Sequence, residues 1–306
     1  MRFEGITPRG ETIELGEPVS ARLDRAADAP ADALNLSFLG SGSEQITRLL
    51  VYDGTRTVFD GLVDEAGSTA DSGGFLRSFS ARSRAALLLD NEARPQKYAG
   101  VSFPMLFSRH AAPYGFTAYS APDQMFLGEF CVQKGESEWT VLENFCRRFL
   151  HTRLTVRPDG SLYAGTDPSG SWRFGDGGIA VISASVAYRF CDLLSEAWVQ
   201  QKQNGAYTPA VRGEAAQNLG IRRRRFFSFS ELAYRRAQDA VENSESGWMT
   251  VTLELPGWIN ALPGDSGTFS GAGYGTLEGL RVSRVVNMLD SGVQTSRVVL
   301  RREGAG

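Results

Sequence analysis

The stretch Leu49-Leu-Val-Tyr-Asp-Gly-Thr-Arg-Thr-Val-Phe59 decides the structural class of the N-terminal part of the chain. Two apolar runs flank Asp53-Gly54, and the Asp-Gly pair readily adopts the positive φ values that a type I′ turn requires. The stretch therefore predicts a β-hairpin. Alternating apolar and polar residues predict further strands at 12–15 and 33–38, and another is expected at 75–80. Short strands joined by turns predict a small barrel or sandwich over residues 1–90.

Residues 91–170 have a different pattern, which predicts a small α+β domain. Ser102 can cap a helix that has Pro104 in its first turn, and the Pro-Tyr-Gly segment at 113–115 would end that helix. A second helix is expected over residues 137–150, because apolar side chains recur there at three- and four-residue spacing. Residues 153–163 then have the pattern of a strand, a turn and a strand.

Residues 171–306 are expected to be mostly β again, with one helix at about residues 230–241. The expected strands cover 179–186, 197–201 and 248–255, and a closing hairpin joins 280–286 to 294–300. Two β-rich regions therefore flank one α+β region. This order predicts a mainly β fold with an α+β insertion, and it permits two similar β-barrels.

Composition narrows the class of protein. The 306 residues are 42% hydrophobic and 22% charged, which is ordinary for a folded domain, and the net charge of −3 gives no overall attraction to nucleic acid or anionic membranes. No window approaches the roughly 20 apolar residues that a membrane span needs. Residues 1–5 are followed by no apolar run, so we expect no secretory signal and a protein made in the cytoplasm.

Few residues are available for a metal centre or for histidine chemistry. The three cysteines, Cys131, Cys146 and Cys191, have no Cys-x-x-Cys spacing, and the only histidines are His110 and His151. A zinc site or a disulfide framework needs more ligands or paired cysteines. We therefore expect no metal site and no cofactor.

Three motifs are candidates for catalysis or phosphate binding. Gly264-Asp-Ser-Gly267 matches the residues around a trypsin-like serine nucleophile, but Thr268-Phe269 follows it and His110 lacks the matching surroundings. A triad needs those partners, so a polar turn is the better interpretation. The glycine-rich segments 271–275 and 172–178 lack the lysine or the strand–helix context of a phosphate loop and are expected to be loops.

Charged residues give two further candidates. Arg222-Arg-Arg-Arg225 precedes Phe226-Phe227, and such a segment can grip single-stranded nucleic acid. In a strand, however, alternate arginines face opposite sides, so we favour an ionic subunit interface or a solvated face. The carboxylates Asp64-Glu65, and Asp53 with Asp60, show no partner signature of a glycosidase and are expected to be loop acids. The sequence thus predicts no catalytic residue.

Three stretches, in order, resemble the baseplate hub protein of contractile phage tails, a family that includes versions in defective prophages and tail-like bacteriocins. The first is Val51-Tyr-Asp-Gly-Thr-Arg-Thr-Val-Phe-Asp-Gly-Leu-Val63, which is similar to an early hairpin carrying Phe-x-Gly-x-Val. The second comprises 86–93, 98–107, 112–116, 137–146 and 157–162, and the third comprises 255–258, 263–264, 279–286 and 290–300. Residues 185–245 match least.

The resemblance implies a fold and an assembly. Two tube-like β-barrel domains, residues 1–90 and 171–306, would flank an α+β domain at residues 91–170. Three copies would form a pseudo-sixfold ring that adapts the hexameric tail tube to the trimeric central spike. The implied partners are the chain itself as a homotrimer, the tube protein and the spike protein, with the tape measure protein as a further candidate.

The resemblance also implies what the chain does not do. It implies no catalytic, cofactor-binding or metal-binding residue, no stable nucleic-acid binding and no insertion into a membrane. The implied location is the baseplate of a virion or phage-like tail particle that is assembled in the host cytoplasm. Two alternatives stay open: a tail-associated enzyme that degrades the cell wall, and a carbohydrate-binding module suggested by five Trp and nine Tyr.

Overall fold

The computed structural model describes residues 1–306 except 41, 43, 73, 166–169, 231 and 303–306. The chain is mainly β with a smaller share of helix, as the sequence predicts. It divides into two compact units, Met1–Pro168 with Val286–Gln294, and Ser169–Val285 with Thr295–Gly306. Strands β20 (Gly275–Asp290) and β21 (Val293–Arg302) contribute residues to both units.

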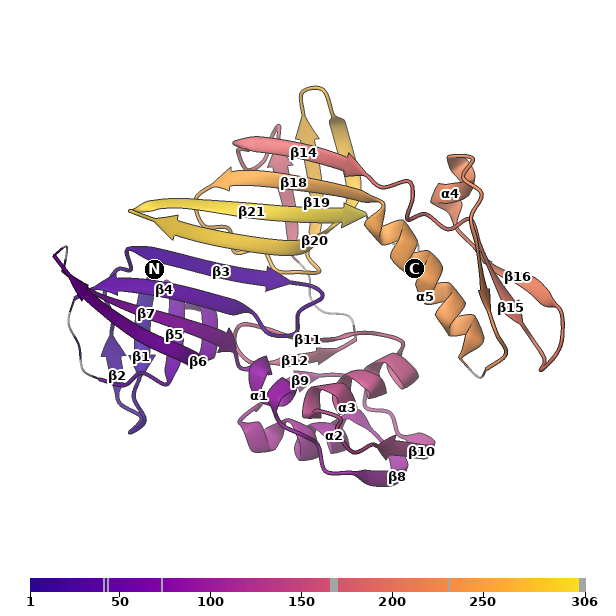
Figure 1. The fold of residues 1–306 in the computed structure, drawn as a ribbon, viewed down its shortest axis with the longest axis horizontal. Helices are drawn as coiled ribbons and strands as arrows, with labels where there is room; N and C mark the ends of the chain where they lie inside the picture. The colour runs from indigo at the N-terminus through magenta and orange to yellow at the C-terminus, as the bar shows by residue number, and fades with distance from the viewer. Residues whose placement is uncertain (41, 43, 73, 166–169, 231, 303–306) are drawn as a thin grey trace. The chain divides into compact units, whose positions relative to one another are not determined.

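The first unit begins with an antiparallel sheet (Figure 1). Its strands are β1 (Arg2–Ile6), β2 (Thr12–Glu14), β3 (Ser20–Ala26), β4 (Ala33–Leu39), β5 (Arg48–Asp53), β6 (Arg56–Asp71) and β7 (Gly74–Ser83). They lie in the order β3-β4-β7-β6-β5-β1-β2. The tip of the β20–β21 hairpin joins this unit beside β3, where Ser291 N donates to Val19 O.

Alternation along the strands gives this sheet one buried face. Leu34, Leu36 and Phe38 of β4 are buried while the residues between them are not, which is the two-residue period of a sheet with one covered side. The hairpin predicted around Asp53-Gly54 is confirmed as β5 and β6. The break expected at 40–43 includes residues 41 and 43, which lie outside the described residues.

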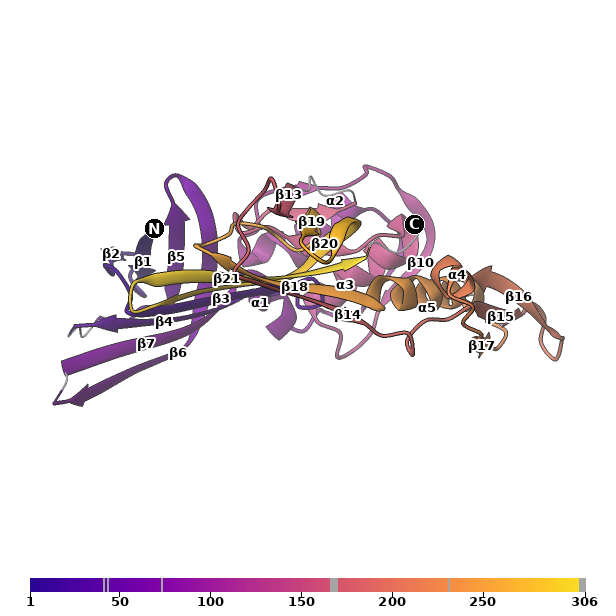
Figure 2. The ribbon, with the colours of Figure 1, turned by 90° about the horizontal axis from the view of Figure 1, so that it is seen from above.

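Strand β6 is far longer than the short strands that the sequence suggests. It has 16 residues, and only its first part pairs with β5. At Gly61 a Cβ atom would lie 2.2 Å from the Arg82 carbonyl oxygen and 2.5 Å from the Phe59 ring, so only glycine fits this close approach. Figure 2 shows β6 and β7 continuing together after β6 has left β5.

The rest of the first unit is the α+β part. Its elements are α1 (Ala85–Asp90), β8 (Gln96–Val101), α2 (Phe103–His110), the 3₁₀ helix Ala112–Tyr114, β9 (Tyr119–Ser120), β10 (Phe126–Val132), α3 (Glu138–Phe145), the π-helix Cys146–Leu150, β11 (Leu154–Val156) and β12 (Leu162–Ala164). The two predicted helices are confirmed, because Ser102 Oγ caps α2 and Ser137 Oγ caps α3. A core of buried residues between Leu88 and Ala164 holds these elements together.

The second unit contains two sheets. Its elements are β13 (Ser171–Gly175), β14 (Ser183–Tyr188), β15 (Glu196–Gln200), β16 (Tyr207–Arg212), α4 (Glu214–Asn218), β17 (Arg224–Phe227), α5 (Ala233–Gly247), β18 (Met249–Pro256) and β19 (Ser266–Gly271), with most of β20 and β21. The larger sheet runs β14-β18-β21-β20, and β20 also pairs with β19, which pairs with β13. The smaller sheet runs β16-β15-β17 (Figure 1).

Two elements of the second unit differ from the sequence expectation. The expected strand at 179–186 begins later, at Ser183, because Ile179 instead forms an isolated bridge to Phe174, in which its N–H donates to Arg173 O. The expected helix at 230–241 runs instead from Ala233 to Gly247. Its last turn buries Ser244 and Glu245, which are polar and therefore do not continue the apolar stripe.

Candidate assembly edges

The motifs that were candidates for catalysis form structural contacts within the chain. In the segment 264–267 the Asp265 carboxylate is buried and accepts hydrogen bonds from Gly170 N at 2.7 Å, Trp172 Nε1 at 2.8 Å and Leu262 N at 2.9 Å. Ser266 Oγ donates to the Gly170 carbonyl at 3.1 Å. A carboxylate with these three donors fixes a turn, as the sequence predicts for this segment.

His110 is fully engaged inside the α+β part of the first unit. Its Nδ1 lies 2.5 Å from Glu138 Oε2, and its Nε2 lies 2.9 Å from the Tyr98 hydroxyl. Tyr114 donates to the other Glu138 oxygen at 3.0 Å. His110 is only 2% exposed, so this network links β8, α2 and α3 around a buried imidazole.

The prediction of loop acids is wrong for the carboxylates singled out in the sequence, because all four lie in strands β5 and β6, where arginines of neighbouring strands pair with Asp60 and Asp64. Asp60 is buried and forms a bidentate pair with Arg48 at 2.6 and 2.5 Å. Asp64 accepts two hydrogen bonds from Arg82, at 2.7 and 2.9 Å. These charge-assisted hydrogen bonds join neighbouring strands, which gives Asp60 and Asp64 a structural role in the sheet.

One glycine-rich segment differs from the loop prediction, because residues 172–175 belong to β13, which pairs with β19, and only 176–178 form a turn. Segment 271–275 is the turn between β19 and β20, where Tyr274 N donates to Gly271 O. Within 222–225 only Arg224 and Arg225 belong to β17. Arg223 donates to the Phe190 carbonyl and Arg224 pairs with Glu196 at 3.0 Å, so these two side chains are held within the chain.

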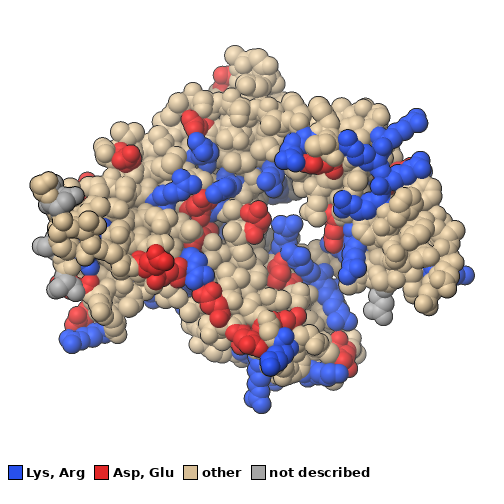
Figure 3. Space-filling model, in the orientation of Figure 1, with Lys and Arg blue, Asp and Glu red and all other residues tan. Residues whose placement is uncertain are grey.

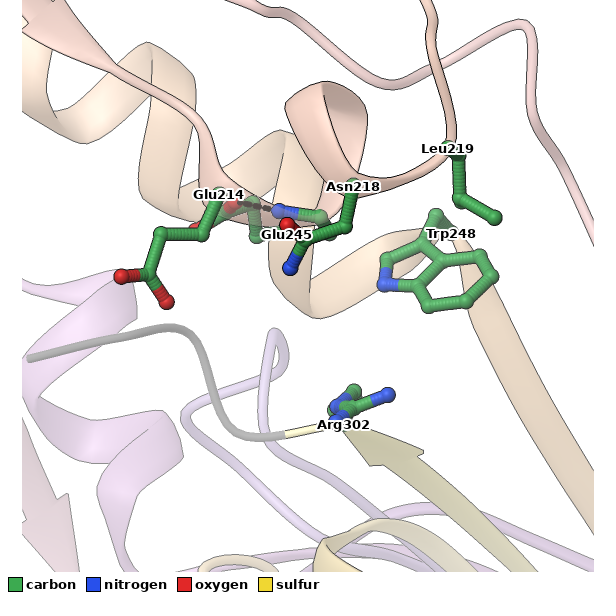
Figure 4. A pocket seen from close by; sticks show the side chains of 7 residues that line it. Glu214, Asn218, Leu219, Glu245, Trp248 and Arg302 are labelled. Atoms are coloured by element: carbon green, nitrogen blue, oxygen red, sulfur yellow. Dashed lines mark hydrogen bonds between the residues drawn. The ribbon is translucent and has the colours of Figure 1, made fainter.

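The second unit has a shallow hollow with a cavity volume of about 370 Å³ (Figure 4). It is lined by Glu214, Ala215, Asn218, Leu219, Glu245, Trp248 and Arg302. The Glu245 carboxylate accepts a hydrogen bond from Ala215 N at 2.8 Å, and the Arg302 guanidinium lies 5.9 Å from the Trp248 ring centre. Within the described residues, no three His, Cys, Asp or Glu side chains gather in a way that could hold a metal.

Two strand edges present backbone N–H and C=O groups that no strand of the described chain pairs with. Strand β14, Ser183-Ala-Ser-Val-Ala-Tyr188, pairs with β18 along its whole length and ends its sheet, so its other edge faces no strand of the described chain. It contains neither a charge nor a proline. The Tyr274 hydroxyl caps the Ala184 carbonyl at 3.3 Å, and beyond it Tyr188 is 49% exposed.

The second open edge lies in the first unit. Residues 65–71 of β6 pair with β7 on one side, whereas β5 pairs only with 56–62 on the other. Small residues fill this segment between Glu65 and Asp71, and the side chains from Asp64 to Ala70 are exposed. A long, flat edge of this kind is a template for pairing with another chain.

Two other strand edges, those of β2 and β16, are short or interrupted. Strand β2 has three residues and ends in Glu14, and β16 contains Pro209. Short length, charge and proline are the usual means of blocking an edge. One strand inward from β14, Glu254 is the register partner of Ser183, and hydrogen bonds from Arg297 and then from Ser183 lower the pKa of its carboxyl.

Sequence reasoning placed no site at these edges. The segment 65–71 is exposed on both faces and so has no apolar alternation, and the residues of β14 were assigned to a strand with an earlier start. The one available signal was composition, because an uncharged strand without proline is unusual at a free edge.

No helix of the described residues is long and apolar enough to span a membrane.

Comparisons with known proteins place the fold among tail proteins. No protein-family model and no curated protein matches the sequence. The chain is similar to the 43 kDa tail protein of prophage MuSo2 from Shewanella oneidensis (TM-score 0.78, 15% identity, 99% of this chain and 98% of that one). It is also similar to a tail protein from Neisseria meningitidis MC58 (TM-score 0.75, 15% identity, 99% and 97%).

A more distant likeness extends to a secretion system. The E. coli c3393 protein, described as a component of the type VI secretion system with structural similarity to the T4 tail proteins gp27 and gp5, gives a TM-score of 0.60 at 9% identity over 94% of this chain and 74% of that one. These likenesses show that the chain has the fold of phage tail proteins.

Proposed function

We propose that this chain is a structural baseplate hub of a phage or phage-like contractile tail. In this proposal three copies form a pseudo-sixfold ring that adapts a hexameric tail tube to a trimeric central spike. The observation that carries it is the pair of open edges, β14 in the second unit and residues 65–71 of β6 in the first. A ring in which each copy joins its neighbour through these two edges would pair both of them.

Cyclic closure requires two different complementary surfaces on one chain, because each copy must offer one to each neighbour. The two edges fulfil this requirement, since they belong to different units and differ in sequence. The barrel domains are proposed at residues 1–90 and 171–306, and the α+β domain at 91–170. The core between Leu88 and Ala164 supports this division.

The same proposal fixes partners and location. The ring would contact the tube protein and the spike protein, and the tape measure protein is a further candidate. The location would be the baseplate of a virion or tail-like particle, assembled in the host cytoplasm, without a stable complex with nucleic acid or insertion into a membrane. The similar tail proteins support this assignment, as do the structural roles of Asp265, His110 and Asp60.

An edge variant tests the proposal. Arg189 N donates to Trp248 O, so odd-numbered residues of β14 face β18 and the Ala184 N–H points to the open edge. Ala184→Pro removes that donor and leaves the pairing with β18 in place. Just before β2, Thr7 N donates to Glu11 O, so the Thr12 N–H points away from β1. Thr12→Pro therefore makes the same change at a protected edge and serves as the control.

Native mass spectrometry of the purified proteins gives the result. The proposal predicts a trimer for the unsubstituted chain and for Thr12→Pro, and a folded monomer for Ala184→Pro. The proposal is contradicted if the unsubstituted chain is monomeric at every concentration and binds neither the tube protein nor the spike protein of its own particle.

A cell-wall enzyme and a carbohydrate-binding module remain the rival functions. Cell-wall turbidity loss abolished by Ser266→Ala would favour the enzyme, and binding on a glycan array would favour the module. The hub proposal predicts neither result, because Ser266 begins β19 and its Oγ donates to the Gly170 carbonyl.

A further inference from the structure

The sheet β16-β15-β17 in the second unit has one covered and one open face. Helix α5 covers the first, where Ala197 and Val199 of β15 pack with Ala237 and Val241 in a small core. Alternation places Trp198 and Glu196 on the other side. No element of the described chain that belongs to this core covers that side. This surface is independent of the open edges discussed above.

The open face carries aromatic rings at one end. Phe226 pairs in register with Trp198, at 6.0 Å between ring centres, and Tyr207 meets Phe226 edge to face at 5.3 Å and 84°. Phe226 is 56% exposed and Tyr207 is 36% exposed. A folded chain rarely leaves such a cluster in water unless something binds to it.

The other end of the same face is basic. Arg212 and Arg224 are the register partners of Glu196 on its two sides. Glu196 is already used, since it accepts from Trp198 Nε1 at 2.9 Å and pairs with Arg224 at 3.0 Å. Arg212, and Arg222 just before β17, form no ion pair with any residue that the structure describes. Figure 3 shows Lys and Arg side chains gathering around α4, at this end.

We propose that this face, Trp198, Tyr207 and Phe226 with Arg212 at its basic end, binds a protein segment that carries apolar anchors followed by carboxylates. The anchors would cover the rings, and the carboxylates would reach Arg212, which lies two register positions from Trp198 and four from Tyr207, or roughly 7 and 13 Å. Charge complementarity requires the bound segment to be negatively charged. The separation between the rings and the basic end determines that its apolar residues and its carboxylates lie in different parts of the segment.

The geometry argues against two other modes of binding. Addition of a strand at β16 is blocked by Pro209, which has no N–H to donate. Stacking of nucleic-acid bases needs free ring faces, but the Arg224 guanidinium lies over Trp198 at 5.3 Å and Tyr207 is set against Phe226. What remains exposed suits aliphatic and aromatic side chains of a protein.

Fluorescence anisotropy with a labelled synthetic peptide tests the proposal. The probe has about ten extended residues, with alternating Leu and Phe at one end and a block of Glu at the other. Phe226→Ser and Arg212→Glu are each expected to weaken its binding at least about tenfold. Tyr234→Ser and Arg236→Glu are the matched controls, because both residues are exposed on α5, outside the proposed face, and both should bind the probe normally.

The remaining outcomes decide against the proposal. It is overturned if the full-length chain does not bind the probe, if a peptide with Lys in place of Glu binds equally well, or if the control variants lose binding as the face variants do. Tighter binding of an oligothymidylate that depends on Phe226 would assign the face to nucleic acid. Self-association lost only in Phe226→Ser would assign it to a second copy. Circular dichroism of each variant verifies that it is folded.

Discussion

Replacing Asp265 by Asn separates a structural role of the segment 264–267 from a catalytic one. The carboxylate holds three donors at 2.7–2.9 Å, and its residue is 4% exposed. Asparagine has one acceptor oxygen, so its NH2 group must face at least one of these donors. A hydrogen bond to a charged group contributes about 1.5–3 kcal/mol, and an unpaired buried donor costs about 1–3 kcal/mol. We expect Asp265→Asn to lower the free energy of unfolding by about 3–5 kcal/mol.

Urea unfolding followed by circular dichroism measures this loss, and Ser266→Ala is the matched control. Its hydroxyl makes one partly exposed hydrogen bond, to the Gly170 carbonyl, so its removal should change the free energy of unfolding by less than about 1 kcal/mol. The structural account is refuted if Asp265→Asn costs less than about 1 kcal/mol, or if Ser266→Ala costs as much as Asp265→Asn.

Three further predictions follow from the core and the surface. Phe145 is fully buried among Phe103, Phe126, Phe130 and Phe149, so Phe145→Ala should lower the free energy of unfolding by about 3–5 kcal/mol in urea, and a loss below about 1 kcal/mol would contradict the packing. Burial raises the pKa of the Cys146 thiol, whereas Cys191 is exposed, so a thiol reagent should modify Cys191 rapidly and Cys146 only after unfolding; mass mapping with Cys146 modified first would disprove this. Arg297 lowers the pKa of Glu254, so their contact should be present above the ordinary glutamate pKa and lost as pH falls through the lowered value; NMR titration should show that lowered value rising in Arg297→Gln, and an unchanged value would exclude the pair.

Local chemistry made part of the fold predictable. The Asp53-Gly54 turn and the serine caps of α2 and α3 are made by residues that lie within a few positions of one another in the sequence. Their sequence signals therefore needed no tertiary context. The same holds for strand β18, whose apolar residues alternate in the sequence as they do in the structure. The mainly β class with an α+β part rests on these signals.

The features that the sequence did not predict depend on contacts between residues far apart in the sequence, or on exposed residues without a periodic pattern. Helix α5 continues past Val241 because Ser244 Oγ accepts from Leu194 N and Glu245 accepts from Ala215 N, and neither contact leaves an apolar pattern. The open edge at 65–71 was hidden because exposed small residues give no periodicity. The arginine run could not be divided from sequence alone, since only the register with β15 places Arg224 beside Glu196.

Electron microscopy of the purified or particle-bound protein tests the central claim most directly. If β14 of one copy meets residues 65–71 of the next, the image should show a threefold ring with six similar lobes around a central opening. Isolated single molecules, or an assembly in which both of these edges stay solvent-exposed, would contradict the account.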